Sequence, residues 1–126
     1  MTTEPTNPGY TLRAVFRRSP GTVAGADVEG LAARVAAVEA AGVTVGGLYD
    51  ASSLRADADL MVWLHGAAPE TLQWALRELR RSSLIESLLP AWNALAVHRD
   101  AEFSANHLPA YMRDTEPKQW LTVYPF

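Results

Sequence analysis

Apolar and polar residues alternate in the first patterned segment of the chain, residues 10–17. The positions of one face are apolar: Tyr10, Leu12, Ala14 and Phe16. Arg13 and Arg17 fall on the opposite face. A period of two residues with one apolar side predicts a strand that buries one face.

The next pattern has helical spacing. Apolar residues recur three or four positions apart at Leu31, Val35, Val38 and Ala41. Asp27 precedes this run and can cap a helix, and Gly42 can end it. Residues 19–26 are rich in glycine and predict a loop between the strand and this helix.

Two further strands are predicted at residues 43–49 and 60–65, joined by a charged loop. Gly46 and Gly47 lie in the first of them and predict a bulge or a close backbone approach. The second strand has apolar residues at both odd and even positions, including Val62 and Trp63, so we expect it to be covered on both faces.

A second helix is predicted to begin near Pro69, since proline fits the first helical turn. Its buried stripe would contain four residues: Leu72, Ala75, Leu76 and Leu79. Three arginines would face water: Arg77, Arg80 and Arg81. Ser83 and Glu86 have capping-box spacing for a short helix at 84–89, which Pro90 would end. Residues 92–98 then predict a fourth strand.

The predicted order is strand, helix, strand, strand, helix, strand. This order is typical of an α+β fold, the ferredoxin-like split βαβ arrangement, with helices on one face of an antiparallel sheet. Residues 10–99 would form this unit, and 100–118 a long connection. Residues 119–126 would start a second unit, with a fifth strand at 120–124. We therefore expect the chain to be a truncated part of a longer protein, in preference to a half that another polypeptide completes.

Composition narrows the class of protein. The chain has 126 residues, which suits one domain, and 48% of them are apolar. Its net charge of −3 offers no broad positive field, so nucleic acid is not an expected partner. No stretch approaches the roughly 20 apolar residues of a membrane span. Residues 1–9 predict a flexible lead-in without the apolar core of a signal peptide, so we expect a cytoplasmic protein.

Three histidines and one tyrosine are the residues with available chemistry. His65 and His98 lie at predicted strand ends, where a structural role is the more common one. His107 lies in the irregular connection and could act as a base near neutral pH, although an ordinary loop histidine is the simpler interpretation. Tyr124 could be a core residue, or could face a redox partner and carry a radical. No metal-binding motif is present.

Two other groups of residues have a structural and a functional interpretation. Trp63 and Trp74 fit either the core or a subunit contact. Arg55, Asp57 and Asp59 form a charge-dense loop, for which a solvated turn with local ion pairs is favoured.

Several separate blocks resemble the actinobacterial coproheme decarboxylases of the chlorite dismutase-like family. The resemblance runs from about residue 10 to the last residue. Its strongest blocks are Tyr10-Thr11-Leu12, Val15-Phe16-Arg17-Arg18, residues 48–66, Val97-His98-Arg99, Ala101-Glu102-Phe103 and residues 120–126. Several blocks in the right order are more specific than any one of them.

The resemblance implies a fold, a reaction and site residues. Family members contain two ferredoxin-like repeats, so this chain would hold the first repeat, half of a dimeric α/β barrel. They use hydrogen peroxide to convert iron coproporphyrin III (coproheme) to heme b, and usually form homopentamers. His107 matches the family's distal histidine, and Tyr124, before Pro125, matches its radical-carrying tyrosine. Phe126 would line the same pocket.

One family feature has no counterpart in this sequence. The histidine that binds the iron lies in the family's second repeat, so this chain alone should hold coproheme weakly. Two alternatives stay open: another chlorite dismutase-like heme enzyme, or a non-catalytic module that dimerises or binds heme.

Overall fold

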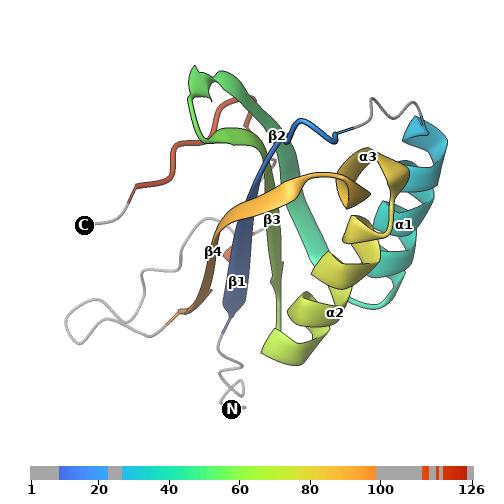
Figure 1. The fold of residues 1–126 in the computed structure, drawn as a ribbon. Helices are drawn as coiled ribbons and strands as arrows, with labels where there is room; N and C mark the ends of the chain where they lie inside the picture. The colour runs from blue at the N-terminus through green and yellow to red at the C-terminus, as the bar shows by residue number, and fades with distance from the viewer. Residues whose placement is uncertain (1–8, 23–26, 99–111, 114–115, 117, 125–126) are drawn as a thin grey trace, which may run out of the picture.

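The computed structural model describes residues 9–22, 27–98, 112–113, 116 and 118–124. Seven elements follow one another along the chain (Figure 1). They are β1 (Tyr10–Arg17), α1 (Val28–Ala40), β2 (Thr44–Arg55), β3 (Ala58–Gly66), α2 (Pro69–Arg80), α3 (Ser83–Glu86) and β4 (Leu89–Val97). The predicted order of strands and helices is confirmed, as are the two long helices.

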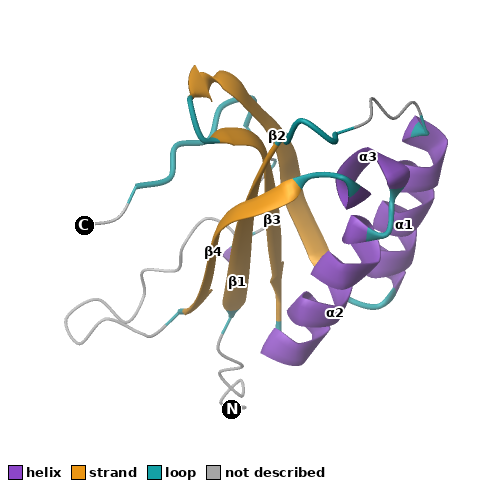
Figure 2. Cartoon of the chain, in the orientation of Figure 1, coloured by secondary structure: helices purple, strands orange, loops and turns teal. Residues whose placement is uncertain are grey.

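The four strands form one antiparallel sheet in the order β2-β3-β1-β4. The first and third strands in sequence are neighbours at the centre, and the second and fourth are the edges, which is the split βαβ arrangement. All three helices lie on one side of the sheet (Figure 2). The predicted α+β fold class is therefore confirmed.

The hydrophobic core lies between the sheet and the helices. The sheet contributes alternate residues of its central strands, α2 contributes a stripe of four, and α1 and α3 contribute one fully buried residue each. The buried residues of this cluster are Leu12, Ala14, Phe16, Val38, Val43, Val62, Leu64, Leu72, Ala75, Leu76, Leu79 and Ile85. The predicted stripe of α2 is buried completely, as a helix with apolar residues at i, i+3, i+4 and i+7 requires.

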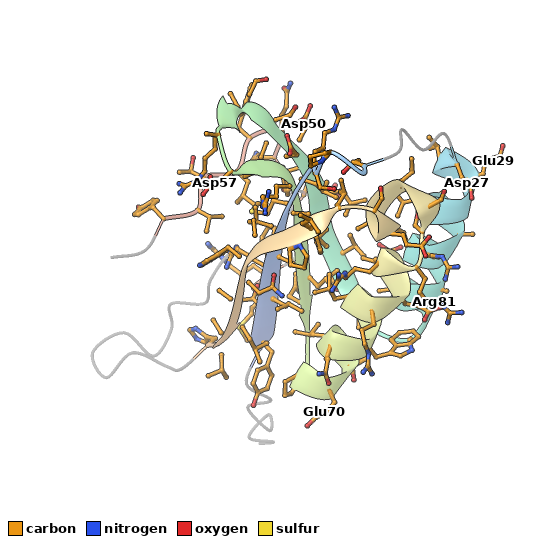
Figure 3. The ribbon with its side chains drawn as sticks, viewed as in Figure 1. Asp27, Glu29, Asp50, Asp57, Glu70 and Arg81 are labelled. Atoms are coloured by element: carbon orange, nitrogen blue, oxygen red, sulfur yellow. The ribbon has the colours of Figure 1, made fainter. Side chains whose placement is uncertain are left out.

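The two long helices, α1 and α2, begin where the sequence signals predicted. The carboxylate of Asp27 accepts a hydrogen bond from the Gly30 N–H at 2.8 Å, which satisfies one of the free donors at the start of α1. Pro69 occupies the first turn of α2. Figure 3 shows Asp27 and Glu70 at opposite ends of the helical layer, because α1 and α2 run in opposite directions.

Several boundaries differ from the prediction. β2 continues to Arg55 and β3 begins at Ala58, so most of the predicted charged loop belongs to strands, and β4 begins at Leu89 instead of residue 92. The short helix is capped by Ser82, whose hydroxyl accepts from the Leu84 N–H, and not by Ser83. It ends at Glu86, and Pro90 lies inside β4. Proline is tolerated there because β4 is an edge strand, and its pairing with β1 shifts register next to Pro90.

The predicted strand at residues 120–124 is absent from the structure, in which residues 118–124 belong to no helix or strand. A strand exists only when it pairs with a neighbour. The described sheet consists of β1, β2, β3 and β4, and residues 120–124 pair with none of them. The predicted lead-in at 1–9 and connection at 100–118 lie mostly outside the described residues. Among the helices that the structure describes, none is long and apolar enough to cross a lipid bilayer.

Candidate functional site

The face of the sheet that the helices do not cover carries the candidate site, and we call it the open face. Strand register places its residues in three rows that run across the sheet. They are Thr44-His65-Thr11-Ala96, Gly47-Trp63-Arg13-Ala94 and Tyr49-Met61-Val15-Trp92. The described C-terminal segment lies on this side of the sheet, away from the helices (Figure 1). Polar and aromatic groups of four strands therefore meet on one surface.

Trp63 is the centre of the best-ordered group on the open face. Its indole Nε1–H donates to the Thr11 hydroxyl at 2.7 Å, and that hydroxyl donates to the Leu64 carbonyl at 3.4 Å. The guanidinium of Arg13 lies over the indole ring, 5.0 Å from its centroid. These contacts join β1 to β3 and fix the orientation of the indole.

Glycine makes room for this indole on the other side. A Cβ built on Gly46 would lie 2.7 Å from two ring atoms of Trp63, closer than real side chains approach. The register of β2 against β3 also shifts between Val45 and Gly47. The predicted bulge and the predicted close approach are both confirmed, and together they place Trp63 against the β2 backbone.

His65 extends the polar row beside Trp63. The two ring centroids are 5.8 Å apart, with the planes tilted by 49°. Burial lowers the pKa of His65 below its ordinary value, since the half-buried ring is poorly solvated when charged. Burial therefore favours the uncharged imidazole, and the positive charge over the indole is that of Arg13.

The charge-dense hairpin at the end of β2 and β3 is a solvated turn with a local ion pair. Arg55 Nε donates to Asp57 at 2.6 Å, and this hydrogen bond lowers the pKa of Asp57. Asp59 accepts from the Arg18 backbone N–H at 2.6 Å. Both Arg55 and Asp57 are exposed, which confirms the structural interpretation of this loop. Within the described ranges, no three residues of metal-binding type lie close enough to share an ion.

The structure describes one of the three predicted site residues. Tyr124 lies in the C-terminal segment, outside any strand, with 67% of its surface exposed. His107 and Phe126 lie outside the described residues. The proximity of His107 to Tyr124 and the lining role of Phe126 remain predictions.

Sequence reasoning missed Thr11 and the role of Arg13. It favoured a structural role for His65 and left Trp63 open between the core and a subunit contact. Alternation does place Thr11 and Arg13 on the polar side of β1. It cannot show which β3 residues lie opposite them, because β1 and β3 are separated by a helix and another strand. The sequence therefore shows which side of β1 these residues occupy, and it does not show which residues of β3 they pair with.

Comparison with known sequences gives two findings. Residues 24–126 match the sequence profile of the chlorite dismutase family. A coproheme decarboxylase from Mycolicibacterium smegmatis (strain ATCC 700084 / mc(2)155) is 40% identical over 122 residues, covering 93% of this chain and 52% of that protein. The chain thus spans about half the length of this curated relative.

Solved structures show the same fold. Chlorite dismutase from Candidatus Nitrospira defluvii in complex with imidazole has a TM-score of 0.59 and 19% identity, covering 86% of this chain and 47% of that one. A variant of the same enzyme in complex with cyanide also has a TM-score of 0.59, with 20% identity, and covers 81% of this chain and 44% of that one.

Proposed function

The chain belongs to the chlorite dismutase family, and we propose that it forms the N-terminal part of a peroxide-dependent coproheme decarboxylase. The observation that carries this proposal is the 40% identity to a coproheme decarboxylase across 93% of the chain. The substrate would be iron coproporphyrin III, the product heme b and the oxidant hydrogen peroxide.

The reaction removes two carboxyl groups from the porphyrin. Each propionate, one peroxide and one proton would give a vinyl group, carbon dioxide and two waters, so that peroxide takes up the two electrons that the side chain loses. A phenol that has lost an electron and a proton can take a hydrogen atom from the propionate, and we assign this role to Tyr124. We assign His107 the role of a base that takes a proton from peroxide.

The described geometry supports an accessible phenol. Tyr124 is exposed, and it belongs to a segment without regular structure. The described C-terminal segment lies on the open-face side of the sheet (Figure 1). A group that must reach a bound substrate needs such access. For the whole protein we further propose a cytoplasmic homopentamer in which the porphyrin iron is bound by a histidine of the second repeat.

The test replaces the matching half of the Mycolicibacterium smegmatis relative with this chain. The chimera should convert coproheme to heme b when peroxide is added, as measured by chromatography of the extracted porphyrin. Tyr124→Phe should keep coproheme binding and lose vinyl formation, since phenylalanine cannot form the phenoxyl radical. Tyr10→Phe is the matched control, because it removes a phenol from the start of β1. Unchanged decarboxylation in Tyr124→Phe would refute the assigned role.

A second variant tests the histidine in the same chimera. His107→Ala should slow the reaction mainly at limiting peroxide, because the proposed base acts on peroxide before any propionate reacts. His98→Ala, which changes a histidine at the end of β4, is the matched control. A normal rate for His107→Ala at limiting peroxide would contradict the proposal.

A binding experiment separates the proposal from a non-catalytic module. The 126-residue chain titrated with ferric coproheme should show little specific change in the Soret band, because the iron ligand is expected in the second repeat. A tight, shifted band would favour an autonomous heme-binding module.

A further inference from the structure

We propose that Arg13 protects Trp63 from one-electron oxidation, so that oxidising equivalents generated near the open face are kept for Tyr124. This inference rests on the proposed function, which supplies the oxidant as peroxide reacting with an iron porphyrin. Arg13 is a positioning residue in this proposal: it acts through the indole and needs no contact with the substrate.

The geometry places a positive charge on the indole. Arg13 and Trp63 are direct cross-strand partners on β1 and β3, and the guanidinium carbon lies 5.0 Å from the ring centroid. The contact is held from two sides. The Nε1–H of Trp63 donates to Thr11, which is only 5% exposed, and the ring packs so close to Gly46 that a Cβ there would overlap it. The indole therefore cannot readily turn away from the guanidinium.

A charge at this position opposes oxidation. Removing one electron from an indole leaves a radical cation whose positive charge is spread over the ring. The guanidinium is always protonated, so two positive charges would then face each other across about 5 Å. Coulomb repulsion at that distance is substantial even with the screening of a partly exposed site. The neutral indole, by contrast, is attracted to the cation. Both effects favour the unoxidised ring.

The other tryptophans provide the contrast. Trp74 on α2 is half-buried like Trp63, whereas Trp92 and Trp120 are exposed. Among the described residues, no guanidinium or ammonium lies over the ring of any of these three. A peroxide enzyme that left Trp63 unprotected would offer its oxidant an electron donor at the centre of the sheet. The electron would then come from the sheet and not from Tyr124, and the propionate would keep its hydrogen atom.

The experiment uses the 126-residue chain without porphyrin or peroxide. Photogenerated ruthenium(III) tris-bipyridine takes one electron from an indole and becomes ruthenium(II), and peptide mass spectrometry then measures the oxidised fraction at each tryptophan. We expect Trp63 to react about tenfold more slowly than Trp74, which is also half-buried, in the native protein. The two should react alike in concentrated urea.

Two substitutions separate charge from packing. Arg13→Gln should raise the oxidation rate of Trp63 about tenfold and leave that of Trp74 unchanged. Arg13→Lys keeps a cation and should restore most of the protection. Equal rates for Trp63 in the Gln and Lys variants would overturn the proposal, because shielding by bulk alone would then explain the native rate. If Arg13→Gln fails to fold, the native ratio of Trp63 to Trp74 decides, and a ratio near one overturns it.

The outcome is independent of the decarboxylase assignment. Porphyrin and peroxide are both absent from the oxidation experiment, so its failure leaves the proposed reaction untouched. If Tyr124→Phe left decarboxylation unchanged in the chimera, the proposed purpose of protecting Trp63 would be lost. The slower oxidation of Trp63 beside Arg13 would still stand.

Discussion

The two faces of the sheet are built from the same strands and hold opposite kinds of residue. On the helix side, Val62 and Leu64 of β3 are almost completely buried, at 1% and 0% exposed. On the open face, Trp63 and His65 of the same strand are half-buried and lie beside Thr11 and Arg13. Apolar packing holds the first face together, and hydrogen bonds and a cation over an aromatic ring order the second.

Along one strand, the residues on the helix side contribute to stability, and those on the open face form the candidate site. Odd and even positions point to opposite sides, so a single run of residues can serve two purposes. A substitution on the helix side should change the free energy of unfolding without changing the environment of the indole, whereas one on the open face should change that environment. Four experiments test how cleanly the two faces separate.

The largest effect is expected from Leu64→Ala. Leu64 is fully buried in the core, and truncation there leaves a cavity that the helices cannot fill completely. The free energy of unfolding should fall by about 2–5 kcal/mol, measured by urea denaturation. Leu54→Ala is the matched control, because Leu54 is 74% exposed and its truncation should cost almost nothing. Similar losses for the two variants would contradict the assigned core.

Gly46→Ala tests the open face from the β2 side. The added methyl would overlap the Trp63 ring, so either the indole or the β2 backbone must move. We expect a loss of about 1–3 kcal/mol and a shifted tryptophan emission maximum. Gly21→Ala is the control, because a Cβ added at Gly21 would lie 3.9 Å from its nearest neighbouring atom, which is an ordinary contact distance. An unchanged emission spectrum in Gly46→Ala would show that the indole does not rest on β2.

Asp27→Ala perturbs the helical layer at a point remote from the open face. Loss of the cap leaves the Gly30 N–H without its carboxylate partner and should cost about 0.5–2 kcal/mol. Asp27→Asn keeps an acceptor and should recover most of this loss. Tryptophan oxidation at Trp63 should be unaffected in both variants. A change there would mean that the helical layer and the open face are coupled.

The smallest effect is expected from acidification through His65. Its folded pKa is lowered, whereas the unfolded imidazole titrates at its ordinary value of 6.5. Below about pH 6.5 the unfolded chain therefore binds more protons than the folded one, and stability falls as the pH falls. His65→Gln should flatten this part of the stability curve, measured by urea denaturation between neutral and mildly acidic pH. A slope identical to that of the parent protein would rule out His65 as its source.

Sequence patterns predicted the helix side better than the open face. The stripe of α2 and the buried face of β1 follow from periodicity, because burial against a second layer is what produces that periodicity. The pairing of Arg13 with Trp63 follows from strand register, which depends on how the sheet assembles and is not written in either strand alone. Pro90 was misplaced for a similar reason: a proline that ends a helix and one that lies in an edge strand look alike in sequence.

The candidate site divides in the same way. The residues alone left Tyr124 open between a core position and a radical carrier, and the family resemblance favoured the second role, since an exposed phenol in an irregular segment has no periodic signature. His107 and Phe126 lie outside the described residues, so the structure adds nothing to their assignment. Thr11 could not be assigned to the site from the sequence, because a threonine in a strand is common and its bond to the Trp63 indole depends on strand pairing.

The edge strand β4 has a practical consequence for anyone who purifies this chain. Its nine residues carry no charge, and four large apolar side chains on it are exposed: Leu89, Trp92, Leu95 and Val97. Natural edge strands usually carry lysine, or twist away, to discourage aggregation. The isolated chain should therefore be handled dilute and cold, and spectra recorded at high concentration should be checked for light scattering before they are interpreted.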